Sequence, residues 1–443
     1  MPAISSRKTY SLVTFGCQMN VHDSEKISGL LRQKGFIAIE NPLQADIVIF
    51  NTCSVRLKAE EKFYTALGRF KKAKEKDSNK LIIVAGCTAQ ASANEIIKRA
   101  PFVDLIIGPR SINNILADIE TINGKTVIDT NLEKDVFSDK ILDSATDIYN
   151  RSSPVRAYVT IMEGCNNFCS YCIVPYTRGR ELYRDKIQII DEIKSLADKG
   201  YLEIILLGQN ANSYKVDRCD FADLLAEAAR VEGIKRIRFV TSHPAFLDDK
   251  TIQAMSEYKN ICSQLHLPIQ SGSNAILEAM NRKYTLEYYM DRIHILKHYI
   301  NNISLSSDFI IGFPGETETD FNATLEALKT VRYDQIFSFI YSPRPNTPSA
   351  RKKDDVPSLI KKARLQKLQE LQREIQIEKN REDVGKVMTV LADGFSKKDK
   401  NVLSGRTISN KVVNFDGSPG NLNKIIEIEI TAASQNSLAG RIV

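Results

Sequence analysis

Residues 158–172 read YVTIMEGCNNFCSYC: an apolar run, a glycine and then three cysteines in a CxxxCxxC spacing. The apolar run predicts a buried strand, so Cys165, Cys169 and Cys172 fall in the loop at its carboxyl end. Five similar runs follow, separated by helical patterns. Six such repeats predict a TIM-type barrel or partial barrel, whose reactive loops lie at the carboxyl ends of its strands. The predicted strands span residues 158–162, 203–207, 237–241, 264–268, 306–311 and 336–341, and the clearest helices span 187–199 and 251–259.

The first third of the chain repeats a shorter pattern, in which an apolar run ends just before a cysteine. The cysteines are Cys17, Cys53 and Cys87, and their spacings of 36 and 34 residues are close to the length of one strand–helix–strand unit. Continuous apolar runs of this kind predict parallel strands that are buried on both faces. The carboxyl ends of such strands share one sheet edge, where ligands bind, so we expect the three cysteines to be neighbours. The runs span residues 12–15, 47–50 and 81–84, and a fourth run at 103–107 precedes Gly108.

A long helix and a small β module are predicted after the barrel. The helix opens at Pro357 and Ser358 and carries an apolar stripe beneath a face rich in lysine and arginine, which is typical of a solvated helix packed on a core. After Val384 the pattern changes to short β runs with Gly and Asn turns, which predict a small all-β barrel. The stripe comprises Leu365, Leu368, Leu371 and Ile375, and the β runs span residues 387–391, 411–415 and 425–431.

These patterns together predict an α/β chain of three domains. Residues 1–147 should form a parallel α/β sheet domain, residues 148–380 a partial (β/α)6 barrel with a trailing helix, and residues 381–443 a small all-β barrel. The polar, acid-rich stretch 131–153 is the expected linker between the first two domains.

The composition fits a large globular protein of the cytoplasm. The chain has 443 residues, 43% hydrophobic and 26% charged, with a net charge of +7, which excludes a disordered chain, a collagen and a disulfide-stapled miniprotein. We find no apolar run that could span a bilayer and no secretory signal, so we expect a cytoplasmic protein without membrane contact. Thiols stay reduced in that compartment, so the eight cysteines indicate metal or redox chemistry before disulfides.

The CxxxCxxC loop has the ligand set of an iron–sulfur cluster. Three thiolates can hold three irons of a [4Fe-4S] cube and leave the fourth iron open for a chelating substrate. Zinc would need a fourth protein ligand, and the nearest histidines in sequence are His22 and His243. The plain alternative is three unrelated buried cysteines. Cys17, Cys53 and Cys87 could form a second cluster of the same kind, or could be small core residues.

In these residues the chain resembles the radical S-adenosylmethionine (SAM) enzymes, and its two three-cysteine sets are similar to those of the methylthiotransferases. That family combines an amino-terminal cluster domain, a radical SAM barrel and a terminal TRAM domain, and the resemblance covers essentially the whole chain. Residues 16–20 (GCQMN), 341–348 (YSPRPNTP), 405–407 (GRT) and 410–415 most resemble the bacterial members that modify a tRNA adenosine.

The resemblance implies two [4Fe-4S] clusters and SAM as cofactors. Cys165, Cys169 and Cys172 would be ligands of the cluster that cleaves SAM to a 5′-deoxyadenosyl radical. Cys17, Cys53 and Cys87 would be ligands of the cluster that carries the sulfur, which one SAM methylates while a second SAM supplies the radical. Tyr171 matches the usual residue beside the adenine, and other strand-end residues fit SAM-pocket positions, although each could also be a polar turn. These residues are Gly208, Gln209, Asn210, Ser242, His243, Gln270 and Asp308.

The implied reaction is sulfur insertion plus methylation at carbon 2 of N6-isopentenyladenosine at position 37 of tRNA. The alternative within the family is another tRNA adenosine modification or a ribosomal protein; outside it, the alternative is a nucleic-acid-binding module or an iron–sulfur electron carrier. Expected partners are the tRNA anticodon stem-loop, a low-potential flavodoxin- or ferredoxin-type electron donor and a sulfur donor, and we expect a monomer. Candidate phosphate contacts are Lys361, Lys362, Arg364 and Lys367, together with Lys397, Lys398 and Lys400 in the β module.

Two departures from the family pattern touch no predicted cluster ligand. Residues 181–184 read ELYR where the family usually continues Glu-Arg-Ser-Arg, and Asn346 replaces a usual glycine. Cys219 and Cys262 match no ligand position, and we expect both to be structural.

Overall fold

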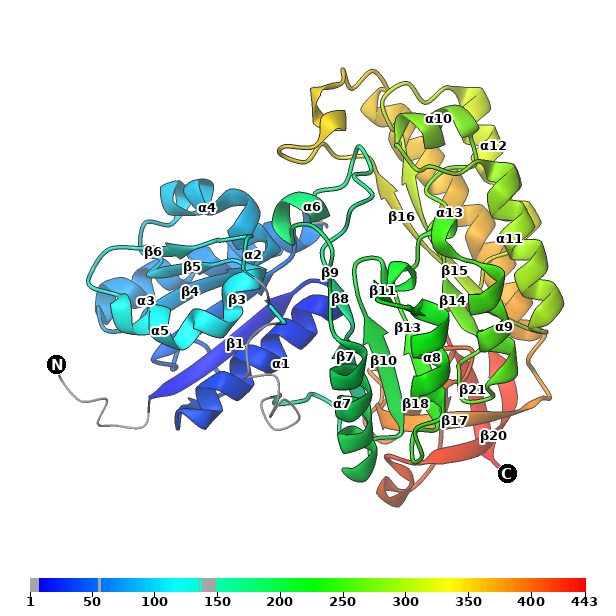
Figure 1. Ribbon diagram of the computed structural model, residues 1–443, viewed down its shortest axis with the longest axis horizontal. Coiled ribbons are helices and arrows are strands. Elements are labelled where there is room, and N and C mark those ends of the chain that lie inside the picture. The colour runs from blue at the N-terminus through cyan, green and yellow to red at the C-terminus, as the bar shows by residue number, and fades with distance from the viewer. Residues whose placement is uncertain (1–7, 55–56, 135, 138–148) are drawn as a thin grey trace.

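The computed structural model describes residues 8–54, 57–134, 136–137 and 149–443. Figure 1 shows an amino-terminal sheet domain beside a central set of parallel strands, with a small carboxyl-terminal β barrel at one end of those strands. The predicted linker, residues 131–153, lies in large part outside the described residues.

The amino-terminal domain is a six-stranded parallel sheet in the order β2-β1-β3-β4-β5-β6. Its central strands are apolar throughout because helices cover both faces: Ile47 and Ile49 point into one core, and Val48 and Phe50 into the other. The predicted strands are confirmed, and only the short edge strands β2 and β6 were not predicted, since neither carries a buried apolar run. The strands are β1 (Thr9–Phe15), β2 (Ile37–Ala38), β3 (Ile47–Thr52), β4 (Leu81–Gly86), β5 (Leu105–Ile107) and β6 (Val127–Asp129).

Two groups of helices cover this sheet. The helices α1 (Gln18–Gln33) and α5 (Ile115–Thr121) pack on one face. The helices α2 (Leu57–Gly68), α3 (Phe70–Lys76) and α4 (Cys87–Arg99) pack on the other.

The central domain contains all six predicted strands in chain order. They form two three-stranded parallel sheets, β7-β10-β13 and β14-β15-β16, and a parallel bridge between Ile237 and Ile261 connects the two. This arrangement is the predicted partial barrel. The strands are β7 (Arg156–Thr160), β10 (Glu203–Leu207), β13 (Arg236–Phe239), β14 (Gln264–His266), β15 (Ser304–Ile311) and β16 (Gln335–Ile340).

The predicted strands 158–162, 237–241 and 264–268 each end two residues earlier in the structure, and the first of them is followed by a separate short strand. The first strand stops at Thr160, and Met162–Glu163 forms a separate short strand, β8, that pairs antiparallel with β9 (Leu182–Tyr183). The β8–β9 pairing brings together the two ends of the segment that carries the CxxxCxxC loop. The remaining elements are α6 (Val174–Thr177), α7 (Lys186–Asp198), β11 (Lys215–Val216), β12 (Cys219–Asp220), α8 (Phe221–Ala229), α9 (Asp249–Glu257), α10 (Asn274–Ala279), α11 (Leu286–Tyr299) and α12 (Glu318–Val331).

The predicted long helix is α13 (Ser358–Arg381), which packs on β15, β16 and α12 and reaches the terminal β barrel. Leu368 and Ile375 of its apolar stripe are buried in the central core, and Leu365 and Leu371 pack against that core. The helix therefore joins the two domains rather than standing free in solvent. Among the described residues, no helix combines the length and the apolar character needed to cross a membrane.

The carboxyl-terminal domain is a closed five-stranded barrel in the order β17-β18-β19-β21-β20. It is fastened to the amino-terminal ends of the central strands by two buried arginines of β13. Arg236 donates to the carbonyl of Thr389 at 2.9 Å, and Arg238 donates to the carbonyl of Thr407 at 2.7 Å. The strands are β17 (Val387–Phe395), β18 (Leu403–Thr407), β19 (Val412–Phe415), β20 (Ile425–Ala433) and β21 (Leu438–Ile442).

Candidate functional site

The CxxxCxxC loop is held tightly at the carboxyl end of the barrel. The Cys165 amide donates to the carbonyl of Gly179 at 3.1 Å, and the Cys172 amide donates to the carbonyl of Cys169 at 2.9 Å. Gly164, just before the loop, has a φ of +85°, and a Cβ there would lie 2.1 Å from the carbonyl oxygen of Arg180. Only glycine fits this position. The backbone therefore places the three cysteines as one unit.

The thiols of this loop interact with one another in a poorly solvated setting. Burial is the main cause that raises the pKa of Cys172 to about 12, with the neighbouring Cys169 and Cys165 adding to it. Burial likewise raises the pKa of Cys165 to about 11. Three thiols that oppose one another's ionisation need a cationic partner to become thiolates, which is what a metal centre supplies.

Two side chains that the sequence analysis did not single out organise this loop. Arg282, almost fully buried, donates to the Cys169 Sγ at 3.2 Å and to the Tyr171 hydroxyl at 3.4 Å. Glu181 accepts from the Asn166 amide at 3.2 Å and from the Tyr183 hydroxyl at 2.6 Å. Nothing in the spacing of either residue distinguishes it from an ordinary surface charge.

Four of the predicted SAM-pocket residues carry buried polar atoms that have no hydrogen-bond partner within the described part of the chain. These atoms are Gln209 Nε2, Asn210 Oδ1, Ser242 Oγ and His243 Nε2. A buried polar atom without a partner costs free energy, and such atoms gathered at strand ends indicate a ligand site. Burial, with help from Arg282, lowers the pKa of His243 to about 2, so this ring is neutral.

The other predicted pocket residues are placed as follows. Gly208 lies so close to Met162 that a Cβ would come within 2.7 Å of its Sδ. Gln270 has a positive φ of +71° and donates its amide to the carbonyl of Asp308 at 2.9 Å. The Asp308 carboxylate lies 3.6 Å from the His266 Nε2. Gly208 directly follows β10 and Gln270 comes after β14, whereas Asp308 lies in the middle of β15 rather than at a strand end.

The three amino-terminal cysteines lie at the carboxyl edge of the sheet, as predicted. Cys17 is the N-cap of α1, Cys53 follows β3, and Cys87 begins α4. A Cβ on Gly16 would lie 2.8 Å from the Cβ of Cys53, so these loops are in contact. Asn20 completes the site, since its Oδ1 accepts from the Cys17 amide at 3.2 Å.

The thiols of this second site have unequal acidities. A hydrogen bond from Cys53 is the largest cause that lowers the pKa of Cys17 to about 6, and the positive charge of Arg178 contributes. Burial raises the pKa of Cys87, which Arg178 opposes. The positive charge of Arg178 therefore acts to lower the pKa of both Cys17 and Cys87.

Among the described residues, no three Cys, His, Asp or Glu side chains converge on one point as a single metal ion requires. Three cysteine thiolates are the ligand set of a [4Fe-4S] cube, in which each thiolate binds its own iron.

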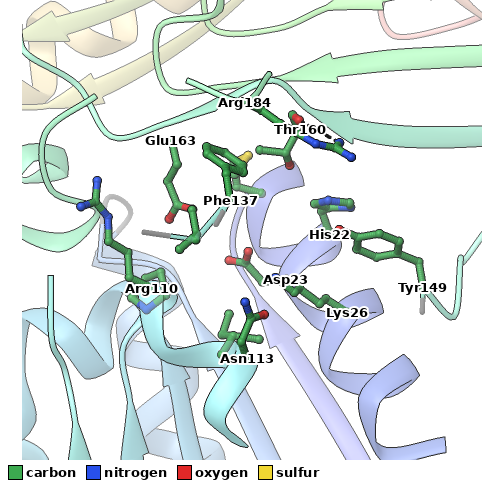
Figure 2. Close-up of a pocket in the computed structure, with 14 residues that line it drawn as sticks. His22, Asp23, Lys26, Arg110, Asn113, Phe137, Tyr149, Thr160, Glu163 and Arg184 are labelled. Carbon is green, nitrogen blue, oxygen red and sulfur yellow. Dashed lines mark hydrogen bonds between the residues drawn. The ribbon is translucent and has the colours of Figure 1, made fainter. Parts of the chain in front are cut away.

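The sheet edge that carries Cys17 packs against the barrel at the interface between the first two domains. Cys17 packs against an apolar cluster that Met19 of α1 forms with Ile205 and Leu207 of β10, the strand that leads into Gly208. A small pocket of about 40 Å³ lies at this interface. Figure 2 shows Asp23 of α1 and Glu163 of the barrel side among the residues that line it. The sheet edge is thus apposed to the barrel.

A larger cavity of about 720 Å³ runs from Cys17 through the barrel interior to the terminal β barrel. Gly16, Cys17 and Gln18 line one end of it. Residues of the terminal domain line the other end, namely Lys397, Arg406, Ser409, Asn410, Lys411, Val412, Asn436, Ser437 and Leu438.

The basic face of α13 differs from the prediction. Lys361 is buried and paired with Asp354, and Arg364 is buried and pairs with Glu316 at 2.8 Å. Their charges are already neutralised by carboxylates, so the prediction that they contact phosphates was wrong. Lys362 and Lys367 remain exposed, as do Lys397, Lys398 and Lys400.

The two remaining cysteines lie in ordinary structural positions. Cys219 belongs to the β11–β12 hairpin. Cys262 is buried, and its amide donates to the carbonyl of Ile237 at 2.9 Å.

Comparison with known protein families matches three segments of the chain. Residues 9–108 match the uncharacterized protein family UPF0004, residues 159–328 the radical SAM superfamily, and residues 381–443 the TRAM domain. Over 97% of its length the chain is 46% identical to a tRNA-2-methylthio-N(6)-dimethylallyladenosine synthase of Clostridium botulinum (strain Loch Maree), of which it covers 96%. The chain belongs to this synthase family. The synthase of Carboxydothermus hydrogenoformans is 43% identical over 99% of the chain, and all of the relative is covered.

A solved structure supports the fold. The radical SAM methyltransferase TsrM from Kitasatospora setae, with cobalamin and a [4Fe-4S] cluster bound, has a TM-score of 0.54 at 14% identity. The similarity covers 78% of this chain and 77% of TsrM. At that identity the likeness concerns the fold alone.

Proposed function

We propose that this chain inserts sulfur and adds a methyl group at carbon 2 of N6-dimethylallyladenosine, also called N6-isopentenyladenosine, in tRNA. The observation that carries the proposal is the docking of the cysteine-bearing sheet edge onto the barrel, where Cys17 lines a cavity that reaches the TRAM domain. Relatives that are 43% and 46% identical over nearly the whole chain bear the corresponding name.

The proposal assigns two [4Fe-4S] clusters and SAM to the chain. The hydrogen-bearing adenine carbon is not electrophilic enough for a thiolate to displace hydride, so the carbon–sulfur bond requires radical chemistry from a cofactor. When bound, one cluster would supply the electron that cleaves SAM, and the other would supply the sulfur. The first cluster would be held by Cys165, Cys169 and Cys172, and the second by Cys17, Cys53 and Cys87.

The barrel residues have defined tasks in this scheme. Glu181 fixes the backbone of the cysteine loop, and Arg282 places a positive charge against Cys169. The unpartnered atoms of Gln209 and Asn210 are available to hydrogen bond SAM, as is the neutral ring of His243. Tyr171, Gly208, Ser242, Gln270 and Asp308 complete the proposed SAM pocket.

The substrate would be the adenosine at position 37 in the anticodon stem-loop. A base in a single-stranded loop can be splayed into a deep site without the cost of breaking a base pair. The cavity between Cys17 and the TRAM domain is large enough to admit such a base. In this scheme residues 1–147 hold the sulfur-carrying cluster, residues 148–380 hold SAM, and residues 381–443 contact tRNA. A low-potential electron donor of flavodoxin or ferredoxin type and a sulfur donor complete the reaction in the cytoplasm, with the chain acting as a monomer.

Nucleoside mass spectrometry tests this proposal directly. Transfer RNA from a strain that lacks the protein should contain N6-isopentenyladenosine and no 2-methylthio derivative, and the full-length protein should restore the derivative. Reconstituted enzyme with SAM and a reductant should modify isopentenylated tRNA and leave tRNA without the isopentenyl group unchanged. Unaltered 2-methylthio nucleosides in the deletion strain would overturn the proposal, and activity on a different tRNA adenosine or on a ribosomal protein would redirect it.

A further inference from the structure

Arg178 is a buried arginine that joins the two cysteine sites. The chain runs from Cys172 directly through the short helix α6 to Arg178. Arg178 is 2% exposed, and its guanidinium donates to the Glu163 carboxylate of its own domain at 3.1 Å and pairs with Asp23 of α1 across the interface. One short segment therefore carries both a proposed ligand of the barrel cluster and this arginine.

The same guanidinium reaches the cysteines of the sheet domain. Its ion pair with Asp23 places it against α1, the helix that Cys17 caps, and its positive charge favours the thiolate forms of Cys87 and Cys17. The contact is structurally supported because α6 packs on α4, the helix that begins at Cys87. Arg178 thus follows the barrel cysteines in sequence, but it lies against the helices that begin at Cys17 and Cys87.

We infer that Arg178 is a positioning residue for the cluster on Cys17, Cys53 and Cys87, supplied by the radical SAM domain. The inference rests on the proposed function, which places a cluster on those three cysteines. A cluster held by three thiolates in a buried setting needs positive charge nearby, and hydrogen bonds to its sulfurs and the local charge set its reduction potential. Arg178 places its positive charge beside these cysteines only when the two domains are docked.

The charges of Arg178 and Asp23 predict the sign of the change in the cluster's midpoint potential for each substitution. Removing the guanidinium leaves the added electron less stabilised, so Arg178→Gln should lower the midpoint potential of the sheet-domain cluster. Asp23 opposes the arginine from the other side, so Asp23→Asn should raise that potential. We expect about a tenfold change in the reduction equilibrium for each, which is about 59 mV for a one-electron couple. Arg178→Lys keeps the charge without the planar donor pair and should give a smaller fall.

The test is a redox titration of the full-length holoprotein followed by electron paramagnetic resonance. Variants that lack either cysteine set identify which signal belongs to which cluster. Arg184→Gln is the matched control, because Arg184 is buried at the same interface, is 3% exposed and pairs with Glu192 without an observed cysteine contact. Glu192 also keeps Arg151 as a partner at 2.8 Å, so this control leaves no buried carboxylate unpaired.

The expected result is a fall with Arg178→Gln, a rise with Asp23→Asn and no shift with Arg184→Gln, all confined to the sheet-domain cluster. Equal potentials in all variants, or an equal shift with Arg184→Gln, would overturn the inference while the proposed function stands. Absence of a second cluster in the unsubstituted protein would overturn both. If Arg178→Gln does not fold, Arg178→Lys and Asp23→Asn decide the matter through the opposite signs of their shifts.

Discussion

Cys165, Cys169 and Cys172 share one short loop, whereas Cys17, Cys53 and Cys87 come together only because three parallel strands end at one sheet edge. The first set is placed by local backbone contacts. The second set depends on correct strand order and on the helices that cover the sheet. A local motif can keep its geometry when the surrounding fold shifts, while a site built from dispersed residues cannot.

The two sites also differ in where their positive charge originates. Arg282, beside Cys169, lies in the same domain as its cysteine. Arg178, beside Cys87, comes from the neighbouring domain. The barrel site is therefore electrostatically complete within its domain, and the sheet site is completed by docking.

The largest expected effect is the loss of SAM cleavage when the three barrel cysteines are replaced. Replacing Cys165, Cys169 and Cys172 together by Ala should leave about half the iron and abolish formation of 5′-deoxyadenosine from SAM, because only the sheet site can still hold a cluster. Iron analysis and chromatography of the SAM products measure both. Cys219→Ala is the control and should change neither. Full iron content in the triple variant would refute the assignment.

The reciprocal substitution should uncouple SAM cleavage from product formation. With Ala at positions 17, 53 and 87 the barrel cluster remains, so reductive cleavage of SAM should continue while methylthio product falls below detection. Assays of 5′-deoxyadenosine and of modified nucleosides on the same samples check this. Undiminished product would show that the sheet cysteines are only core residues, and Cys262→Ala provides the matched buried control.

The same contrast explains which residues of the two sites can be predicted from the sequence. The CxxxCxxC spacing reveals the barrel site directly, and strand-end cysteines at regular intervals reveal the sheet site once a parallel topology is assumed. Arg178 and Arg282 escape prediction because a single arginine has the same appearance whether it faces solvent or a buried thiol. The reverse error occurred at Lys361 and Arg364: their helical positions indicate a basic face, but the acidic partners come from loops whose placement the sequence does not show.

The acidities of the thiols give a third contrast, in the metal-free protein. Cys17 and Cys165 are both partly exposed, but the pKa of Cys17 is lowered to about 6 and that of Cys165 is raised to about 11. At pH 7.5 the fraction of thiol present as thiolate is larger for Cys17 than for Cys165 by roughly three orders of magnitude. The Cys165 thiolate is the more basic and therefore the more nucleophilic, which offsets most of that difference. We therefore expect Cys17 to be alkylated about tenfold faster than Cys165.

Iodoacetamide labelling with peptide mass spectrometry measures these rates. Labelling of Cys17 should fall as the pH drops through about 6, since a lowered pKa keeps the thiolate present above that value and protonates it below. Labelling of Cys165 should still be rising above pH 9. Equal rates and the same pH profile at the two cysteines would show that the two sites do not differ in their electrostatics.

The smallest expected effect concerns the exposed lysines of the TRAM domain, which lie far along the chain from every cysteine ligand. Replacing Lys397, Lys398 and Lys400 by Gln should weaken tRNA binding and leave SAM cleavage without tRNA unchanged. Affinity for nucleic acid falls with salt by a slope of about −0.7 per phosphate contact for a single strand, so three lost contacts would flatten the slope by about 2.

Binding assays across a salt series measure this slope, and three lysines of α3 provide the matched control: Lys71, Lys72 and Lys76, which are also exposed. Their replacement by Gln removes the same charge from the sheet domain, so general attraction falls equally in both variants. A flatter slope for the TRAM variant alone places phosphates beside the cavity end that Lys397 lines. Identical slopes for the two variants would assign tRNA recognition to the sheet domain and the barrel rim, and would leave the TRAM barrel as the cap that Arg236 and Arg238 fasten to the central strands.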